Sequence, residues 1–263
     1  MRAIAILLTM LVSFAAQAYD PAHRNWNTLL AQHVHWSDNG TSTRVDYAGM
    51  KRDRNALRAY LAELSKVTAS EYSRWPKDEQ EAFLVNAYNA ATVELVLTRY
   101  PDIASIKDIG GLLGSPWRQR FVVLLGKTRT LDEIEHQMIR GSKTYTDPRI
   151  HFAVNCASIG CPALRPEAYI GARFRQQLED QTVRFLRDRS RNHFDSAKRR
   201  IAVSSIFDWY GADFTKRYGS VGAFLARYPR PLGLDAEAVR DLASGTIKPT
   251  FGSYDWRLNG AER

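Results

Sequence analysis

Apolar residues recur at helical spacing along most of the chain, and segment 78–100 shows this most strongly. One stripe of this segment is apolar, and valines and leucines also cover much of the remaining surface. The stripe consists of Phe83, Leu84, Ala87, Tyr88, Ala91 and Leu95. A helix that is apolar on nearly all sides is buried, so we expect this helix at the centre of the core, with Pro101 ending it.

The same reading predicts further helices and a few short strands. Thr130 and Glu133 match a capping box, which starts a helix over 131–140. The other predicted helices are 23–35, 55–66, 174–189, 206–217, 221–228 and 236–244, and the predicted extended segments lie at 44–47, 117–125, 149–155 and 200–204. Few strands separated by many helices predict a helix-rich α+β fold, with the central helix packed on a small, mainly antiparallel sheet.

The first 18 residues have the pattern of a cleavable signal peptide. Arg2 precedes a short apolar run, and residues 16–18 (Ala-Gln-Ala) form a small-x-small cleavage site. We therefore expect a periplasmic or secreted protein that begins at Tyr19, without a transmembrane anchor. Residues 19–263 are expected to form one globular domain, with a core over about 25–220 and a helical extension over 221–263.

The chain is basic, with a formal charge of +9 that falls to +8 once Arg2 is removed. This favours contact with anionic envelope polymers, small molecules or peptides, and export argues against a nucleic-acid partner. Part of the excess lies in one run. It contains Arg184, Arg187, Arg189, Arg191, Lys198, Arg199 and Arg200. Such a run is either a solvated helix and loop or an anion-binding surface. Nothing in the sequence requires an oligomer, so we expect a monomer.

Segment 147–156 carries the most chemistry. Alternation along a strand over 149–155 would place His151, Ala153 and Asn155 on one face, and Cys156 follows where the strand meets a loop. Buried polar side chains need hydrogen-bond partners, and loops at strand ends often carry functional groups. This segment is therefore our first candidate for a site.

The only two cysteines, Cys156 and Cys161, allow three interpretations. Cys156 is a nucleophile with His151 or His136 as its base. Alternatively, the two cysteines form a structural disulfide that closes a six-residue loop, which contributes about 2 kcal/mol. A redox pair is the third possibility, although the spacing is wider than in common thiol oxidoreductases.

Polar side chains on two predicted helices are further candidates. Asn86 and Asn89 share one face of the central helix, where they either tie loops to it or bind an amide-bearing ligand. His136 lies on one helix face with Asp132 and Arg140, which is either an exposed ion-paired surface or part of a site.

Several other polar residues have simpler expected roles. His23, His33 and His35 are expected at the surface or in loops. Ser205 and Asp208 fit a second helix cap, and Asp208 could alternatively orient a histidine. No tightly spaced His or Cys ligand pair occurs, so we expect neither a metal nor a cofactor.

Four segments, in this order, resemble the domain-of-unknown-function family 547. They are FLVNAYNA (83–90), LDEIEH (131–136), HFAVNC through CP (151–162) and IFDWY with DF (206–214). The resemblance spans about residues 25–220 and implies no established activity or site residue.

A looser likeness is to the papain-like and transglutaminase-like cysteine enzymes, because a buried helix precedes a strand that opens with His-aromatic-Ala. In those enzymes the nucleophile starts the buried helix, whereas this helix has no Cys. This remains an analogy at the level of the fold.

These observations predict a polar pocket formed by Asn86, Asn89, His136, His151, Asn155 and Cys156. One hypothesis is a thiol-dependent hydrolase or acyltransferase acting on envelope amides or peptides, with Cys156, His151 and His136 as catalytic residues and the asparagines binding substrate. The other hypothesis is a non-catalytic binding or scaffold protein that contains a structural Cys156–Cys161 disulfide.

Overall fold

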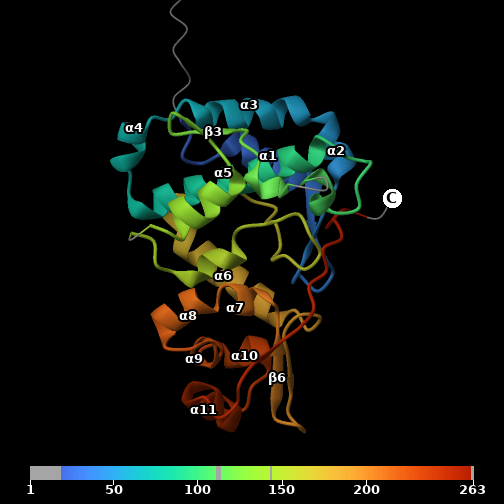
Figure 1. Cartoon of the computed structure of the whole chain (residues 1–263), viewed down its shortest axis with the longest axis vertical. Helices are drawn as coiled ribbons and strands as arrows, with labels where there is room; N and C mark the ends of the chain where they lie inside the picture. The colour runs from blue at the N-terminus through green and yellow to red at the C-terminus, as the bar shows by residue number, and fades with distance from the viewer. Residues whose placement is uncertain (1–18, 111–113, 143, 262–263) are drawn as a thin grey trace, which may run out of the picture.

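The computed structural model describes residues 19–110, 114–142 and 144–261 (Figure 1). The predicted signal peptide over 1–18 lies outside these residues. The α-helices are α1 (Arg24–His33), α2 (Tyr47–Arg52), α3 (Arg54–Ser65), α4 (Ala69–Ser73), α5 (Lys77–Leu97), α6 (Phe174–Arg187), α7 (Ile206–Trp209), α8 (Gly211–Tyr218), α9 (Val221–Leu225), α10 (Pro229–Leu232) and α11 (Ala236–Ser244). Shorter helical segments are η1 (Ile106–Gly110), η2 (Pro116–Arg118), η3 (Glu133–Ile139, a π-helix), η4 (Pro148–Phe152) and η5 (Gly171–Arg173).

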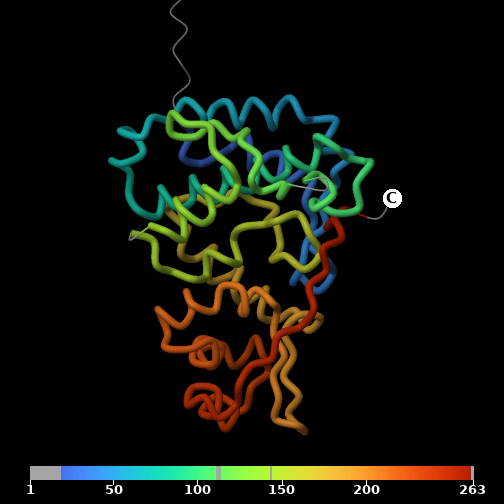
Figure 2. The backbone as a smooth tube through the Cα atoms, in the orientation of Figure 1, coloured from blue at the N-terminus to red at the C-terminus, as the bar shows by residue number. Residues whose placement is uncertain are grey.

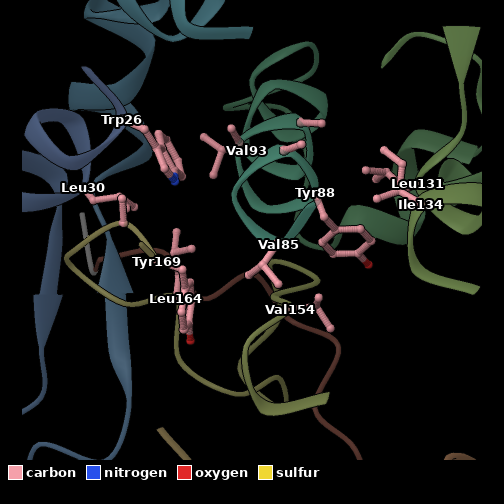
Figure 3. Packing of buried hydrophobic residues seen from close by; sticks show 14 of the residues in the cluster. Trp26, Leu30, Val85, Tyr88, Val93, Leu131, Ile134, Val154, Leu164 and Tyr169 are labelled. Atoms are coloured by element: carbon pink, nitrogen blue, oxygen red, sulfur yellow. The ribbon is translucent and has the colours of Figure 1, made fainter. Parts of the chain in front are cut away.

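Helix α5 is the predicted central helix, and every residue from Glu81 to Leu97 is buried. Figure 3 shows Trp26 and Leu30 of α1 on one side of it and Leu131 and Ile134 on the other. Its apolar side chains point in all directions, so it is stable only when other elements enclose it. Helix α3, η3, η5 and α6 all pack against it.

The strands of the described residues form three small sheets, which together with the helices confirm the helix-rich α+β class. Strands β1 (Val34–Trp36) and β2 (Thr43–Val45) pair antiparallel, as do β3 (Val122–Leu124) and β4 (Lys127–Arg129). The third sheet has the order β5 (His193–Asp195), β6 (Arg200–Val203) and β7 (Thr250–Phe251), and β7 runs parallel to β6. The strand content is thus divided among three sheets instead of forming a single sheet beneath α5.

The prediction of a strand over 149–155 is wrong, because η4 occupies Pro148–Phe152 as a 3₁₀ helix. The Asp147 carboxylate accepts a hydrogen bond from the Arg149 backbone N–H at 3.1 Å and so caps the helix. Pro148 has no N–H and a fixed φ, which suits the first helical position. His151 and Asn155 therefore do not share a strand face.

The buried hydrophobic residues form two clusters, one around α5 and one formed mainly by α6–α11 with β5 and β6. The predicted helix over 206–217 is divided at Tyr210 into α7 and α8. Residues 250–261 are extended and return past the second cluster towards the first (Figure 2). Bridges join Leu258 to Ser158 and Gly260 to Val45, so this last segment connects distant parts of the chain.

Two histidines expected near the surface are buried instead. His23 is 1% exposed, and its Nδ1 lies 2.6 Å from the Tyr60 hydroxyl. His33 is 3% exposed, and its Nε2 lies 2.8 Å from the Asp53 carboxylate. Each ring enters the interior because a polar partner is available there. None of the helices within the described ranges is long and apolar enough to cross a membrane.

Candidate functional site

A cleft of about 270 Å³ lies where the four family-like segments meet, and we call it the aromatic cleft. It is lined by Tyr88, Trp117, Asp132, Glu135, His136, His151, Val154, Cys156, Cys161, Pro162, Ile206, Trp209, Tyr210, Tyr254 and Trp256. Cys156, His151 and His136 were all predicted as site residues, and the tertiary structure brings the three together. Tyr254 and Trp256 come from the returning segment 250–261.

His151 has an environment suited to chemistry. Its side chain is 1% exposed, and its Nε2 lies 2.8 Å from Oδ2 of Asp213. The carboxylate accepts a hydrogen bond, so the proton is assigned to Nε2 and Nδ1 is left as an acceptor. Nδ1 is buried and has no partner among the described residues. Burial lowers the pKa of His151, and the hydrogen bond to Asp213 opposes this shift only in part. The lowered pKa keeps the imidazole neutral.

Arg140 connects the two predicted catalytic histidines. Its Nε donates to Oδ2 of Asp213 at 2.8 Å, and its Nη1 lies 3.0 Å from Nδ1 of His136. The hydrogen bond from His151 and the interactions with Arg140 hold the pKa of Asp213 far below its ordinary value. His136, Arg140, Asp213 and His151 therefore form one continuous polar network, of which His136 and His151 line the cleft.

Tyr210 packs against this network and completes it. Its ring stacks on His151, with 3.9 Å between the centroids, and the Arg140 guanidinium lies 4.7 Å from its ring centroid. Its hydroxyl donates to Oε1 of Glu135 at 2.7 Å. Burial, and then the neighbouring Glu135 charge, raise the pKa values of both Tyr210 and Tyr88, so both phenols stay protonated.

Cys156 and Cys161 form a disulfide in this structure, with their Cα atoms 6.1 Å apart. Sγ of Cys156 also lies 3.0 Å from the Tyr254 hydroxyl and 3.3 Å from Oγ of Ser158. Within the described residues, neither cysteine sulfur is hydrogen-bonded to an imidazole. In this state Cys156 is therefore part of a fixed wall and is not a nucleophile.

The three predicted binding residues all lie outside the lining of the cleft. Asn86 donates to the Tyr169 carbonyl at 2.7 Å and accepts from its N–H at 3.0 Å. Asn89 donates to the Ala153 carbonyl at 3.0 Å and accepts from the Asn155 N–H at 2.8 Å. Asn155 donates to the Pro162 carbonyl at 2.7 Å. Each amide pairs with backbone, and those of Asn89 and Asn155 position the segment that lines the cleft.

The outer wall of the cleft is aromatic. Trp209 is 47% exposed and lies nearly parallel to Trp256, with 5.8 Å between the ring centroids. The ring centroids of Tyr254 and Trp256 are 4.6 Å apart, and Trp117 packs edge to face on Trp256 with 5.8 Å between the centroids. Nζ of Lys107 lies 3.6 Å from the Trp256 ring centroid, so one face of this wall already holds an ammonium group.

Sequence reasoning missed Asp213, Tyr210 and Glu135 as site residues. It considered Asp208 as a helix cap or as a partner of a histidine, but Asp213 has the latter role. Ser205 does not cap α7 either, because its Oγ donates to the Gly252 carbonyl. The signal that could have found these residues is their place in the family-like segments, since Asp213-Phe214 and Glu135-His136 both belong to them.

Metal binding finds no support in the geometry of the described ranges. They contain no group of three or more His, Cys, Asp or Glu side chains placed to hold a metal ion.

Comparisons with known proteins give one match. The sequence model of the family described as "Protein of unknown function, DUF547" matches residues 72–186. No curated protein and no solved structure matches the chain significantly, so the looser likeness to papain-like enzymes is not confirmed. Residues 72–186, which contribute Tyr88, His136, His151 and both cysteines to the aromatic cleft, therefore belong to the DUF547 family.

Proposed function

We propose that this protein is a non-catalytic binding protein of the cell envelope whose aromatic cleft takes a peptide or amine-bearing ligand. One observation carries the proposal. A single cleft combines an aromatic outer wall with the side chains of His136, His151, Asp132 and Glu135, while both of its cysteines are held in a disulfide. Apolar and aromatic pockets with a few polar groups are typical of small-ligand sites.

The polar groups of the cleft define the chemistry of the ligand. Nδ1 of His151 is buried and has no hydrogen-bond partner within the described residues, so a ligand that packs beside it and donates an N–H or O–H would satisfy it. Asp132 and Glu135 add carboxylates to the lining of the aromatic cleft. Aromatic faces attract cations, and the contact between Lys107 and Trp256 is an example within the chain. A ligand rich in N–H groups or bearing an ammonium matches this combination.

The disulfide favours binding over thiol chemistry. A nucleophilic cysteine requires a thiolate and a base within hydrogen-bond reach. Here the sulfur of Cys156 is bonded to Cys161, and its other close neighbours are the hydroxyls of Tyr254 and Ser158. The disulfide instead fixes the loop that forms part of the cleft wall, which reduces the conformational cost of binding a ligand.

An envelope location is part of the proposal. It is supported by the pattern of residues 1–18 and by the disulfide, since disulfides persist in oxidising compartments. Tyr19 is tied into the fold, because its ring stacks on Trp75 at 4.3 Å and its hydroxyl donates to Glu79 at 2.5 Å. Cell fractionation with N-terminal sequencing tests this location. Recovery of the protein in the cytoplasm with Met1 retained would contradict it.

Binding can be tested by titrating the tripeptide Ala-Lys-Ala while following tryptophan fluorescence, with Ala-Gln-Ala as the uncharged comparison. We expect saturable binding of the lysine peptide, at least tenfold weaker for Trp209→Ala. The matched control is Phe251→Ala, because Phe251 is a similarly exposed aromatic residue (44%) that does not line the cleft. No saturable signal from either peptide, or equal weakening by the two substitutions, would overturn the proposal.

A second candidate function is acyl transfer by the reduced protein. It is favoured by His151, whose Nδ1 has no partner in the described part of the chain and whose ring is held by Asp213 in the same cleft as Cys156. A dithiol reductant would supply two electrons to open the disulfide, after which His151 would accept the Cys156 proton.

Iodoacetamide alkylation of the reduced protein, followed by mass spectrometry at each cysteine, tests this second function. It predicts that Cys156 reacts faster than Cys161 at neutral pH and that Asp213→Asn removes the difference. Asp208→Asn serves as the control, because Asp208 does not contact His151 in this structure. Equal and ordinary reactivity of the two thiols would exclude a thiolate activated by His151.

A further inference from the structure

A second hollow contains four arginines and lies apart from the polar network of the aromatic cleft. Its volume is about 450 Å³, and we call it the arginine hollow. Arg44 of β2, Arg187 at the end of α6, and Arg189 and Arg191 of the following loop all line it. Cys161 and Pro162 line both cavities, so the disulfide loop is a shared wall.

The positive charge of this hollow is not balanced by the protein. Within the described ranges, Arg44, Arg187 and Arg189 form no ion pair. The one carboxylate in the lining, Asp188, lies 3.2 Å from Arg191 and accepts a hydrogen bond from the Ser190 hydroxyl at 2.6 Å. Four guanidinium groups thus face one carboxylate that is already engaged.

The neighbouring acidic side chains are already paired with arginines outside the hollow. Asp255 is paired with Arg257 at 2.5 Å, and Asp180 is paired with Arg165 at 2.6 Å. Clustered like charges in a concave surface raise the local positive potential and concentrate anions there.

Arg191 gives the hollow a fixed positive floor. Its Nη1 donates to the Cys161 carbonyl at 2.6 Å, and its Nη2 donates to the Ile159 carbonyl at 2.7 Å. The side chain is only 11% exposed, so its charge is held in place. Burial lowers the pKa of Arg191, against the opposing charge of Asp188. Arg44, Arg187 and Arg189 are exposed and can turn towards a bound anion.

We propose that the arginine hollow is a binding site for a phosphate-bearing ligand. Guanidinium groups match phosphate oxygens through paired hydrogen bonds, and several arginines together suit a multiply charged anion. The volume falls in the range of small-ligand pockets. The phosphate can belong to a small molecule or to a phosphate-containing polymer, which share this chemistry. The site uses none of the acceptors proposed for the aromatic cleft, so it stands independently of the function proposed there.

The test is isothermal titration calorimetry with pyrophosphate and with long-chain polyphosphate as probes, and with citrate as a carboxylate comparison. We expect salt-sensitive binding that is at least tenfold weaker in Arg44→Ala/Arg187→Ala. The matched control is Arg230→Ala/Arg240→Ala, which removes the same charge from two exposed arginines without an ion pair in the described chain. This control should change the affinity less than twofold. Thermal unfolding confirms that both variants remain folded.

The outcomes are distinct. Tighter binding of polyphosphate than of pyrophosphate, per phosphate group, supports a polymer as the source, and equal binding supports a small molecule. Equal weakening by the site variant and the control variant would show that only overall charge matters and would overturn the proposal. Equally tight citrate binding would overturn the phosphate class. Absence of binding by both phosphate probes would exclude the site.

Discussion

Asn89 offers the sharpest test of how the central helix builds the cleft. Its side chain is 2% exposed in α5 and makes two hydrogen bonds to a segment more than sixty residues away. One is donated to the Ala153 carbonyl at 3.0 Å, and the other is accepted from the Asn155 N–H at 2.8 Å. This segment connects His151 to Cys156, so Asn89 holds a wall of the aromatic cleft from behind.

The cost of Asn89→Ala follows from these contacts. The substitution leaves one buried carbonyl and one buried N–H without a partner, and each such group costs about 1–3 kcal/mol. We therefore expect a loss of about 2–6 kcal/mol in the free energy of unfolding. For a chain of this size, a central value of about 4 kcal/mol lowers Tm by about 8–16 °C.

The assay is urea and thermal unfolding, with Asn86→Ala as the matched control. Asn86 makes the same pair of hydrogen bonds to Tyr169, which does not line the cleft. We expect similar losses of stability in both variants, but increased hydrogen exchange over residues 153–156 only in Asn89→Ala. A loss below about 0.5 kcal/mol for Asn89→Ala would refute the reasoning, since that is the usual effect of a surface substitution.

Three further predictions concern stability elsewhere. Burial lowers the pKa of His23 to about 4, so below pH 6.5 the unfolded chain binds a proton that the folded protein does not. The free energy of unfolding of the wild type should therefore fall by about 3 kcal/mol as the pH drops from 6.5 to 4. Urea unfolding of His23→Gln at the same pH values should lack this contribution to the pH dependence. Thr130→Ala removes the hydroxyl that accepts from the Glu133 N–H at 2.9 Å and should cost about 1 kcal/mol in urea unfolding; no change would argue against the cap. Cys156→Ser/Cys161→Ser should lose about 2 kcal/mol relative to the oxidised protein, and equal Tm values would show that the loop is held by other contacts.

The sequence was sufficient for features that depend on local patterns. The all-round apolar surface of 78–100 predicted the buried helix α5, found over Lys77–Leu97. The Thr130/Glu133 pattern predicted a capping box whose two hydrogen bonds are present, at 2.9 and 3.1 Å. Both follow from the helical period and from the unpaired N–H groups at a helix start, which involve only neighbouring residues.

Local reasoning failed at segment 149–155, where a short apolar run fits either a strand or a turn of helix. Asp147 and Pro148 decide for the helix, through a side-chain cap and a fixed φ. The alternation that placed His151 beside Asn155 therefore does not exist. His151 faces Asp213, and Asn155 is tied to Asn89 and Pro162.

The sequence by itself determined the helix-rich α+β class, the buried central helix and the family-like segments, because these depend on residues close together in the chain. It also singled out Cys156, His151 and His136. Only the tertiary structure decided that these three meet, that Asp213 holds His151, and that Trp256 closes the same cleft from the returning end of the chain. Contacts between residues 62 to more than 100 positions apart depend on how whole elements pack, and no local spacing in the sequence records that packing.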